Sequence, residues 1–203
     1  MGVNIMTKPF SQACENNKKP ILETLTRVLA NHKQVLEIGS GTGQHAVYFA
    51  KHLPFLTWKT SDLAINHAGI NQWIADFPTA NIKQPLTIDL AGVLPLTENI
   101  DAIFTANTLH IISWPLVQIF FNMVDKQLTE NGALCIYGPF NYQGKYTSAS
   151  NANFDLWLKA RDEDSGIRDF EAVCQLATKA GLSLKEDIAM PANNRMLIFK
   201  KIA

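Results

Sequence analysis

Three glycines between a short apolar run and a helical pattern constrain this chain more than any other feature. The apolar run is Val35–Ile38, the glycines are Gly39, Gly41 and Gly43, and the helical pattern begins at Gln44. Glycine permits positive φ angles and lets a ligand approach the backbone closely. The helix that follows presents free N–H groups. A strand, loop and helix in this order are typical of nucleotide binding at the carboxyl ends of parallel strands.

Apolar runs alternate with amphipathic segments along the first two thirds of the chain. We expect strands at Val35–Ile38, Leu56–Thr60, Leu86–Leu90, Ile100–Ala106 and Ala133–Tyr137. We expect helices at Ile21–Ala30, with Pro20 in the first turn, and at Gln44–His52, Asn66–Phe77 and Pro115–Leu128. Such alternation predicts an α/β protein with a parallel sheet that helices cover on both faces.

The final third has a different pattern. Helical periodicity at Phe154–Lys159 and Asp169–Ala180 precedes strand-like runs at Ser183–Met190 and Arg195–Lys201. The turn-rich Pro191–Asn194 separates the two runs, which predicts a hairpin. We therefore expect one domain over residues 1–203, a Rossmann-like doubly wound, mostly parallel sheet of seven strands that ends in an antiparallel hairpin.

Composition narrows the classes of partner. The 203 residues hold 18 Lys and Arg against 18 Asp and Glu, so the formal net charge is zero and nucleic-acid binding is disfavoured. Three scattered cysteines favour neither a disulfide framework nor a zinc site. No apolar run reaches the length of a membrane span. We expect a cytoplasmic protein without a metal, whose oligomeric state the sequence leaves open.

Two classes of ligand compete for the glycine loop. Gly41, Gly43 and Ala46 satisfy the dinucleotide pattern G-x-G-x-x-[GA], which alone is a weak signal. Glu37 stands two residues before the first glycine, where a carboxylate would repel a pyrophosphate. S-adenosylmethionine carries an ammonium and a sulfonium, which tolerate a nearby acid. Glu37 with Gly39, Ser40, Gly41 and Gly43 therefore favours S-adenosylmethionine over a nicotinamide dinucleotide.

Two further acids close expected strands. Asp62 ends the second strand, where an acid can accept hydrogen bonds from ribose hydroxyls, although it could equally cap the next helix. Asp89 ends the third strand, where an acid can accept a hydrogen bond from the adenine amine. Leu63 and Leu90 follow these acids and could cover the faces of the adenine ring.

Together these residues resemble the class I S-adenosylmethionine-dependent methyltransferases. Further segments resemble one methyltransferase-like family of unknown function, from about Phe10 to Lys200. These segments are Phe10–Ile21, Ser40–Ala46, Trp58–Leu63, Ala106–Ile111, Gly138–Asn141, Ser150–Asp155, Gly166–Asp169 and Met190–Asn194. The resemblance implies the fold, S-adenosylmethionine as cofactor and S-adenosylhomocysteine as product, but no substrate. It also implies that Glu15, Asn16 and Asn17 cap the methionine end of the cofactor.

In that fold the transferable methyl group points toward the loops after strands four and five. Asn107, His110, Asn141 and Tyr142 lie in those loops and are expected near the cofactor and the acceptor. His110 could act as a general base, line the pocket or only bond within its loop. Methyl transfer often needs only proximity and alignment, so a dedicated base is not required.

Two later segments also leave alternatives open. Arg168 lies in a charge-dense stretch that is either a solvated loop or a source of one arginine for an anionic substrate. Asn194 either makes the hairpin turn or orients a substrate.

The expected function is methyl transfer to a small molecule, because three segments could close over the cofactor. They are Phe10–Lys19, Asn141–Asp169 and Met190–Asn194. The alternatives are a non-catalytic cofactor-binding module or partner subunit, an acceptor such as a peptide tail or unpaired nucleotide, and, more remotely, a dinucleotide oxidoreductase.

Overall fold

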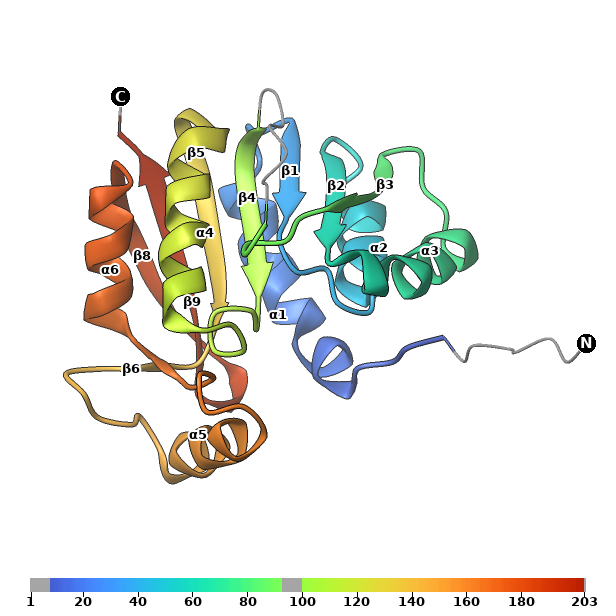
Figure 1. Ribbon diagram of the computed structural model, residues 1–203. Coiled ribbons are helices and arrows are strands. Elements are labelled where there is room, and N and C mark those ends of the chain that lie inside the picture. Colours follow the sequence, from blue (N-terminus) through green and yellow to red (C-terminus); the bar gives the residue numbers. More distant parts are fainter. Residues whose placement is uncertain (1–7, 93–99, 203) are drawn as a thin grey trace, which may run out of the picture.

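The computed structural model describes residues 8–92 and 100–202 as a central sheet between two layers of helices (Figure 1). The strands of the sheet are β1 (Gln34–Glu37), β2 (Thr57–Asp62), β3 (Ile82–Thr87), β4 (Ile100–Ala106), β5 (Leu128–Gly138), β8 (Leu182–Met190) and β9 (Asn194–Lys201). Their order is β3-β2-β1-β4-β5-β9-β8. The first five are parallel, and β9 is antiparallel to β5 and β8. The predicted fold class, including the terminal hairpin, is confirmed.

The described residues form six α-helices. They are α1 (Gln12–Val28), α2 (Gln44–His52), α3 (His67–Asp76), α4 (Trp114–Gln127), α5 (Ala149–Arg161) and α6 (Phe170–Lys179). Short 3-10 turns cover Ala64–Asn66 and Pro191–Asn193, and a separate two-stranded ladder joins β6 (Phe140–Asn141) to β7 (Arg168–Asp169). Helix α5 and this ladder lie below the edge at which the parallel strands end (Figure 1).

Alternation along the strands divides the interior into two cores. Val35 of β1 packs with α1, α2 and α3, whereas its neighbour Leu36 packs with α4 and α6. In β4, Ile103 belongs to the second core and Phe104 to the first. Successive side chains of a strand point to opposite faces, so a sheet that is buried on both sides needs apolar residues at consecutive positions.

The first helix begins nine residues earlier than the sequence predicts. The Ser11 hydroxyl accepts a hydrogen bond from the Cys14 backbone N–H and caps the helix. We expected Pro20 in the first turn of this helix, but it lies inside α1. The error arose because the first turns of α1 are polar, so apolar periodicity could not reveal them. Most of the expected cover, Phe10–Lys19, is consequently helical.

The third strand was also misplaced. It runs over Ile82–Thr87 and contains Pro85, whereas we expected Leu86–Leu90. Proline lacks an N–H donor and is tolerated on an edge strand, which is the position of β3 in the sheet. Asp89 therefore lies two residues beyond the strand that we expected it to close.

Candidate functional site

Three glycines shape the loop between β1 and α2, and only one faces open space. Gly39, Gly41 and Gly43 have φ angles of 73°, 57° and 89°, which favour glycine. A Cβ on Gly39 would lie 2.7 Å from Thr108 Oγ1, and one on Gly43 would lie 3.0 Å from Ile70 Cα. A Cβ on Gly41 would meet no described atom within 4 Å. Two glycines thus allow close packing, while Gly41 leaves room for a ligand.

Glu37 supports the loop from below. Its side chain is buried, and Oε2 accepts hydrogen bonds from Ser40 Oγ at 2.9 Å and Trp58 Nε1 at 3.0 Å. Burial raises the pKa of the Glu37 carboxyl to about 7, although both hydrogen bonds oppose the shift. A carboxyl with this pKa is only partly ionised near neutral pH, so charge repulsion excludes a pyrophosphate less strongly than the sequence suggested.

Asp62 joins the glycine loop to the end of β2. Its Oδ2 accepts a hydrogen bond from the Gly41 N–H at 2.7 Å, while Oδ1 accepts from Leu63 N at 2.7 Å and Asn66 Nδ2 at 2.6 Å. An ionised carboxylate has about four acceptor sites, so roughly one remains for a ribose hydroxyl. Capping of the next turn and loop support therefore coexist in this side chain.

The three residues expected near the adenine differ in their exposure to solvent. Leu63 is 46% exposed, as a residue that contacts a bound ring could be. Leu90 is buried in the core beside α4. Asp89 is exposed, and its Oδ1 accepts a hydrogen bond from the Ala91 N–H at 2.9 Å, which closes a local turn.

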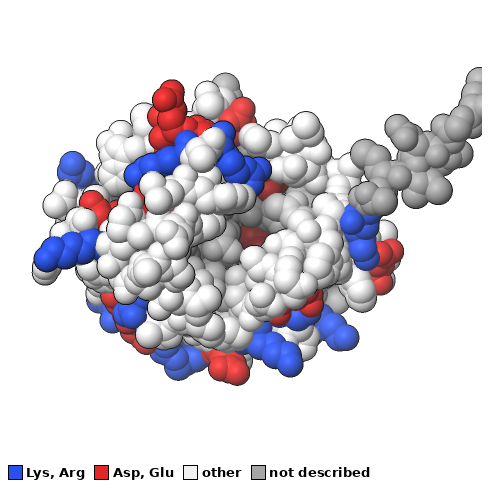
Figure 2. Space-filling model, turned by 90° about the horizontal axis from the view of Figure 1, so that it is seen from below, with Lys and Arg blue, Asp and Glu red and all other residues white. Residues whose placement is uncertain are grey.

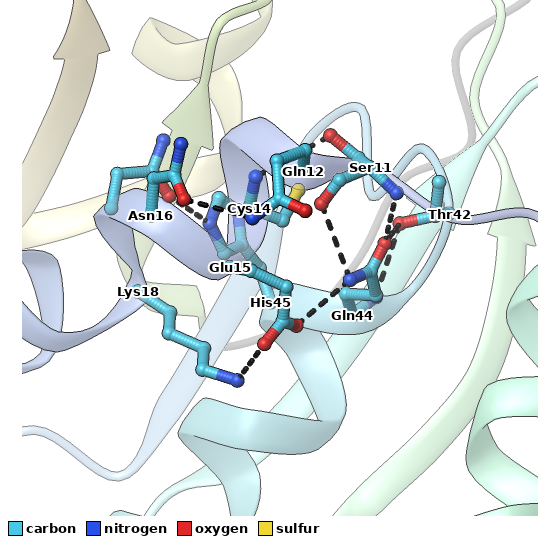
Figure 3. Close-up of polar contacts among 10 residues, drawn as sticks. Ser11, Gln12, Cys14, Glu15, Asn16, Lys18, Thr42, Gln44 and His45 are labelled. Atoms are coloured by element: carbon cyan, nitrogen blue, oxygen red, sulfur yellow. Dashed lines mark hydrogen bonds and ion pairs between the residues drawn. The ribbon is translucent and has the colours of Figure 1, made fainter.

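The start of α1 docks onto the glycine loop through Gln44, which sequence reasoning missed (Figure 3). Gln44 Oε1 accepts from the Ser11 N–H, and Gln44 Nε2 donates to the Ser11 carbonyl and to Glu15 Oε1. Asn16 accepts a hydrogen bond from Gln12 at 2.9 Å, within α1. Gln44 is buried, so these bonds fix the first turns of α1 beside the loop.

A buried histidine lies one residue further on. His45 Nε2 lies 2.6 Å from Asn17 Oδ1, and both side chains are almost inaccessible to solvent. Burial lowers the pKa of His45 to about 4, so this imidazole is neutral under physiological conditions. The contact with Asn17 makes His45 part of the α1–α2 contact, and the ring also stacks on Phe49 of its own helix.

The loop after β4 carries Asn107 and His110. Asn107 has a φ of 59°, an uncommon conformation that asparagine tolerates, and its N–H donates to the Tyr137 carbonyl. His110 is 5% exposed and contacts the Phe154 ring edge-on at a centroid distance of 5.3 Å. Burial, and then the charge of Arg168, lowers the pKa of His110 to about 4.

Arg168 holds this loop in place. Its Nε donates to the Leu109 carbonyl at 3.0 Å, and Nη2 donates to the carbonyls of Ile112 and Asp164. Of the two alternatives for this charge-dense stretch, the solvated loop does not describe Arg168, because the guanidinium is half-buried and hydrogen-bonded. Three of its donor interactions serve the fold, whereas Nη1 makes no hydrogen bond to the described residues.

Tyr142 and Asn194 are also engaged within the protein. The Tyr142 hydroxyl donates to Asp187 Oδ2 at 2.8 Å, and Arg195 binds the other oxygen of Asp187 at 2.7 Å. Asn194 Nδ2 donates to the carbonyls of Pro191 and Ala192, as the turn-forming alternative predicted. Tyr142 thus ties the segment after β5 to the hairpin, and Asn194 closes the hairpin turn.

Helix α5 is fastened in its first turn and at its middle. Asn151 donates to the Asn193 carbonyl at 3.1 Å, which joins α5 to the hairpin tip. Asp155, which is almost fully buried, accepts hydrogen bonds from the Tyr146 hydroxyl at 2.7 Å and the Ile167 N–H at 2.6 Å. Sequence reasoning did not identify Asp155, whose partners include residues that are distant along the chain.

The face at the carboxyl ends of the parallel strands is hollowed. Figure 2 shows this hollow from below, with acidic side chains visible inside it and uncharged residues around most of its mouth. Lys and Arg side chains gather along one side (Figure 2). The glycine loop, Asp62 and the loop that carries His110 all follow strands that end at this edge.

Two further properties bear on function. Within residues 8–92 and 100–202, no three His, Cys, Asp or Glu side chains are grouped as metal ligands would be. In the same ranges no helix has the length and apolar character needed to cross a membrane.

Comparison with known proteins defines the class of protein. A family model described as a protein of unknown function, DUF938, matches residues 8–201, so the chain belongs to that family. The fold is shared with an O-methyltransferase family protein from Burkholderia thailandensis, with a TM-score of 0.78, 16% identity, and coverage of 92% of this chain and 56% of that one.

Two other solved structures share the fold. An O-methyltransferase family 2 protein from Planctomyces limnophilus, in complex with apigenin, has a TM-score of 0.80, 15% identity, and coverage of 94% and 58%. An O-methyltransferase from neocarzinostatin biosynthesis, in complex with S-adenosylmethionine and a naphthoic acid, has a TM-score of 0.76, 14% identity, and coverage of 94% and 55%. The present chain therefore spans a little over half the length of these proteins.

Proposed function

We propose that this protein is an S-adenosylmethionine-dependent methyltransferase that acts on a small-molecule acceptor. The observation that carries the proposal is the cradle at Gly41, where a positive φ angle and open space adjoin the Asp62 carboxylate. A Cβ would fill this space, as expected where a ligand lies against the backbone. When bound, the cofactor supplies an electrophilic methyl group on its sulfonium.

Two of the cofactor-binding residues have a proposed contact. Asp62 accepts a ribose hydroxyl through its remaining acceptor site, and Leu63 covers one face of the adenine. The other residues assigned to the cofactor are Glu37, Gly39, Ser40, Gly41, Gly43, Asp89, Leu90, Asn107 and Asn16. Of these, Leu90 and Asp89 have the weaker support, because Leu90 is buried in the core and the exposed Asp89 closes its own turn.

The acceptor side supports positioning more than proton removal. A His110 imidazole with a pKa near 4 is a weak base, so we assign it to pocket lining and orientation. Asn141 is the other direct candidate for contact with the acceptor. Tyr142, Arg168 and Asn194 act through the segments that they hold, and catalysis then rests on proximity and alignment.

The class of acceptor rests on enclosure. Helix α5, the hairpin tip and the start of α1 are each tied down by hydrogen bonds beside the strand ends, which suits a small molecule better than a duplex. Two solved structures that share the fold hold small molecules, apigenin in one and a naphthoic acid in the other. The alternative is a non-catalytic module that keeps the cofactor without turnover.

The test is transfer of an isotopically labelled methyl group into a fractionated cell extract, resolved by mass. We expect the label in the small-molecule fraction. A variant whose cradle is blocked at Gly41 should transfer less label into that fraction. Label confined to protein or nucleic acid would contradict the acceptor class. No labelled product in any fraction, with cofactor still bound, would favour the module.

A further inference from the structure

Asn141 and Asp169 lie side by side on the small ladder below the sheet. The ladder is parallel and pairs Phe140 with Arg168 and Asn141 with Asp169. Phe140 is buried in the core, and the Arg168 side chain reaches the carbonyls of the loop after β4. Paired residues project from the same face, and successive residues from opposite faces. Asn141 and Asp169 therefore share the face turned away from that core.

Asn141 holds an acceptor without a donor. Its Oδ1 is buried and receives no hydrogen bond from the described residues. Its Nδ2 makes one long contact, 3.5 Å, with the Ile167 carbonyl. A buried acceptor left unsatisfied destabilises a folded protein, so each such group needs an explanation.

Asp169 supplies a second acceptor beside the first. It directly precedes α6 but makes no side-chain capping bond, and its carboxylate forms no hydrogen bond or ion pair with the described residues. The hydrogen bond to Asp155 raises the pKa of Tyr146, and the charge of Asp169 adds to that shift. The Asp169 carboxylate is therefore close enough to Tyr146 for its charge to act on that hydroxyl.

Two cations of neighbouring segments, Lys159 and Arg168, bind other groups. Lys159 pairs with Asp155 at 2.7 Å, and Arg168 donates to main-chain carbonyls. The Tyr146 hydroxyl also donates to Asp155. Two acceptor side chains, one of them a carboxylate, thus stand at paired positions of the ladder without a donor from these three side chains.

We infer that Asn141 and Asp169 bind a hydrogen-bond-donating cationic group of the acceptor, namely an ammonium group. An ammonium has several N–H donors and can satisfy both oxygens at once, with charge assistance from the carboxylate. A bare hard cation would need more oxygen ligands than these two residues offer. The inference rests on the proposed function, because it takes the occupant of this edge to be the methyl acceptor.

The experiment titrates the isotope-labelled protein, saturated with S-adenosylhomocysteine, with ethylamine, 2-phenylethylamine and 1,4-diaminobutane, followed by nuclear magnetic resonance. We expect at least one amine to shift the Asn141 side-chain amide, and its alcohol and carboxylate analogues to bind about tenfold more weakly or not at all. Equal binding of amine and alcohol, or no shift at Asn141 with any amine, would overturn the inference.

Three variants separate recognition from folding. Asp169→Asn should weaken amine binding about tenfold, whereas Glu163→Gln, which removes one negative charge from the preceding exposed stretch, should not. Asn141→Leu should weaken amine binding without lowering the melting temperature, because it removes an unsatisfied oxygen. Unchanged amine affinity in Asp169→Asn would also overturn the inference.

The same titration distinguishes this inference from the proposed function. If S-adenosylhomocysteine binds and no amine does, the pair has been misassigned and the methyltransferase proposal stands. If an amine binds at Asn141 and S-adenosylhomocysteine does not bind, the pair stands as a ligand site and the proposed function fails.

Discussion

Gly41 and Asp62 form the smallest unit of the site, a backbone N–H that donates to a carboxylate at 2.7 Å. The sequence identified both residues, because a glycine after a strand and an acid after the next strand have a recognisable spacing. It did not reveal that Asp62 also serves Leu63 and Asn66. The spacing along the chain identifies the residue types, whereas the hydrogen-bond partners of Asp62 become visible only in the folded loop.

The cradle makes a prediction at Gly41. Gly41→Ala should cost about 1 kcal/mol in free energy of unfolding, because alanine disfavours a φ of 57°. It should also weaken S-adenosylhomocysteine binding about tenfold or more, since the added methyl fills the ligand space. Gly144→Ala is the matched control, because Gly144 has a φ of 69° and no described atom within 4 Å of its Cβ position. Equal affinities for the two variants would contradict the cradle.

Glu37 makes a prediction about pH. Its folded-state pKa, about 7, lies above its ordinary value of 4.5, so the folded state binds the extra proton between these values. Stability from this group is therefore complete below about pH 4.5 and is lost as the pH rises to about 7. The shift corresponds to about 3 kcal/mol.

Denaturant unfolding of wild type and Glu37→Gln at about pH 5 and pH 8 checks this sign. From about pH 5 to pH 8, the free energy of unfolding of the variant relative to that of the wild type should rise by up to about 3 kcal/mol. A stability difference that does not change with pH would show that Glu37 titrates normally.

The elements differ in how far the sequence could place them. Helix α2 and strand β4 occur where their patterns predicted, because apolar periodicity and the glycine loop mark their ends. Helix α1 and strand β3 were misplaced, since polar first turns and an edge-strand proline carry no such signal. The bonds that fasten α5 and β7 link residues as far apart as Leu109 and Arg168, which no local pattern reveals.

A substitution at Arg168 tests whether hydrogen bonds from β7 stabilise the loop after β4. Arg168→Lys keeps the charge but loses the planar fork that reaches Leu109 and Ile112, so we expect a loss of about 1–3 kcal/mol. Hydrogen exchange at residues 107–113 should also quicken. Arg161→Lys is the control, because Arg161 lies over the exposed Trp157 ring. An unchanged rate of hydrogen exchange in Arg168→Lys would show that the loop is stable without the bonds from Arg168.

At the scale of the whole molecule, the strands that precede the proposed ligand contacts end at one edge of the sheet (Figure 1). Parallel strands β1, β2 and β4 end there, α5 is bonded to the hairpin tip, and the start of α1 is bonded to the glycine loop. The alternation of strands and helices predicted this edge, because parallel strands bring their following loops together. The closure of the edge depends on contacts between distant segments, which only the fold displays.

Calorimetric titration of the purified protein with S-adenosylhomocysteine, and separately with oxidised and reduced nicotinamide dinucleotides, tests the central claim most directly. We predict one-to-one binding of S-adenosylhomocysteine and no detectable binding of either dinucleotide. Binding of a dinucleotide alone would contradict the account and make the glycine loop that of an oxidoreductase.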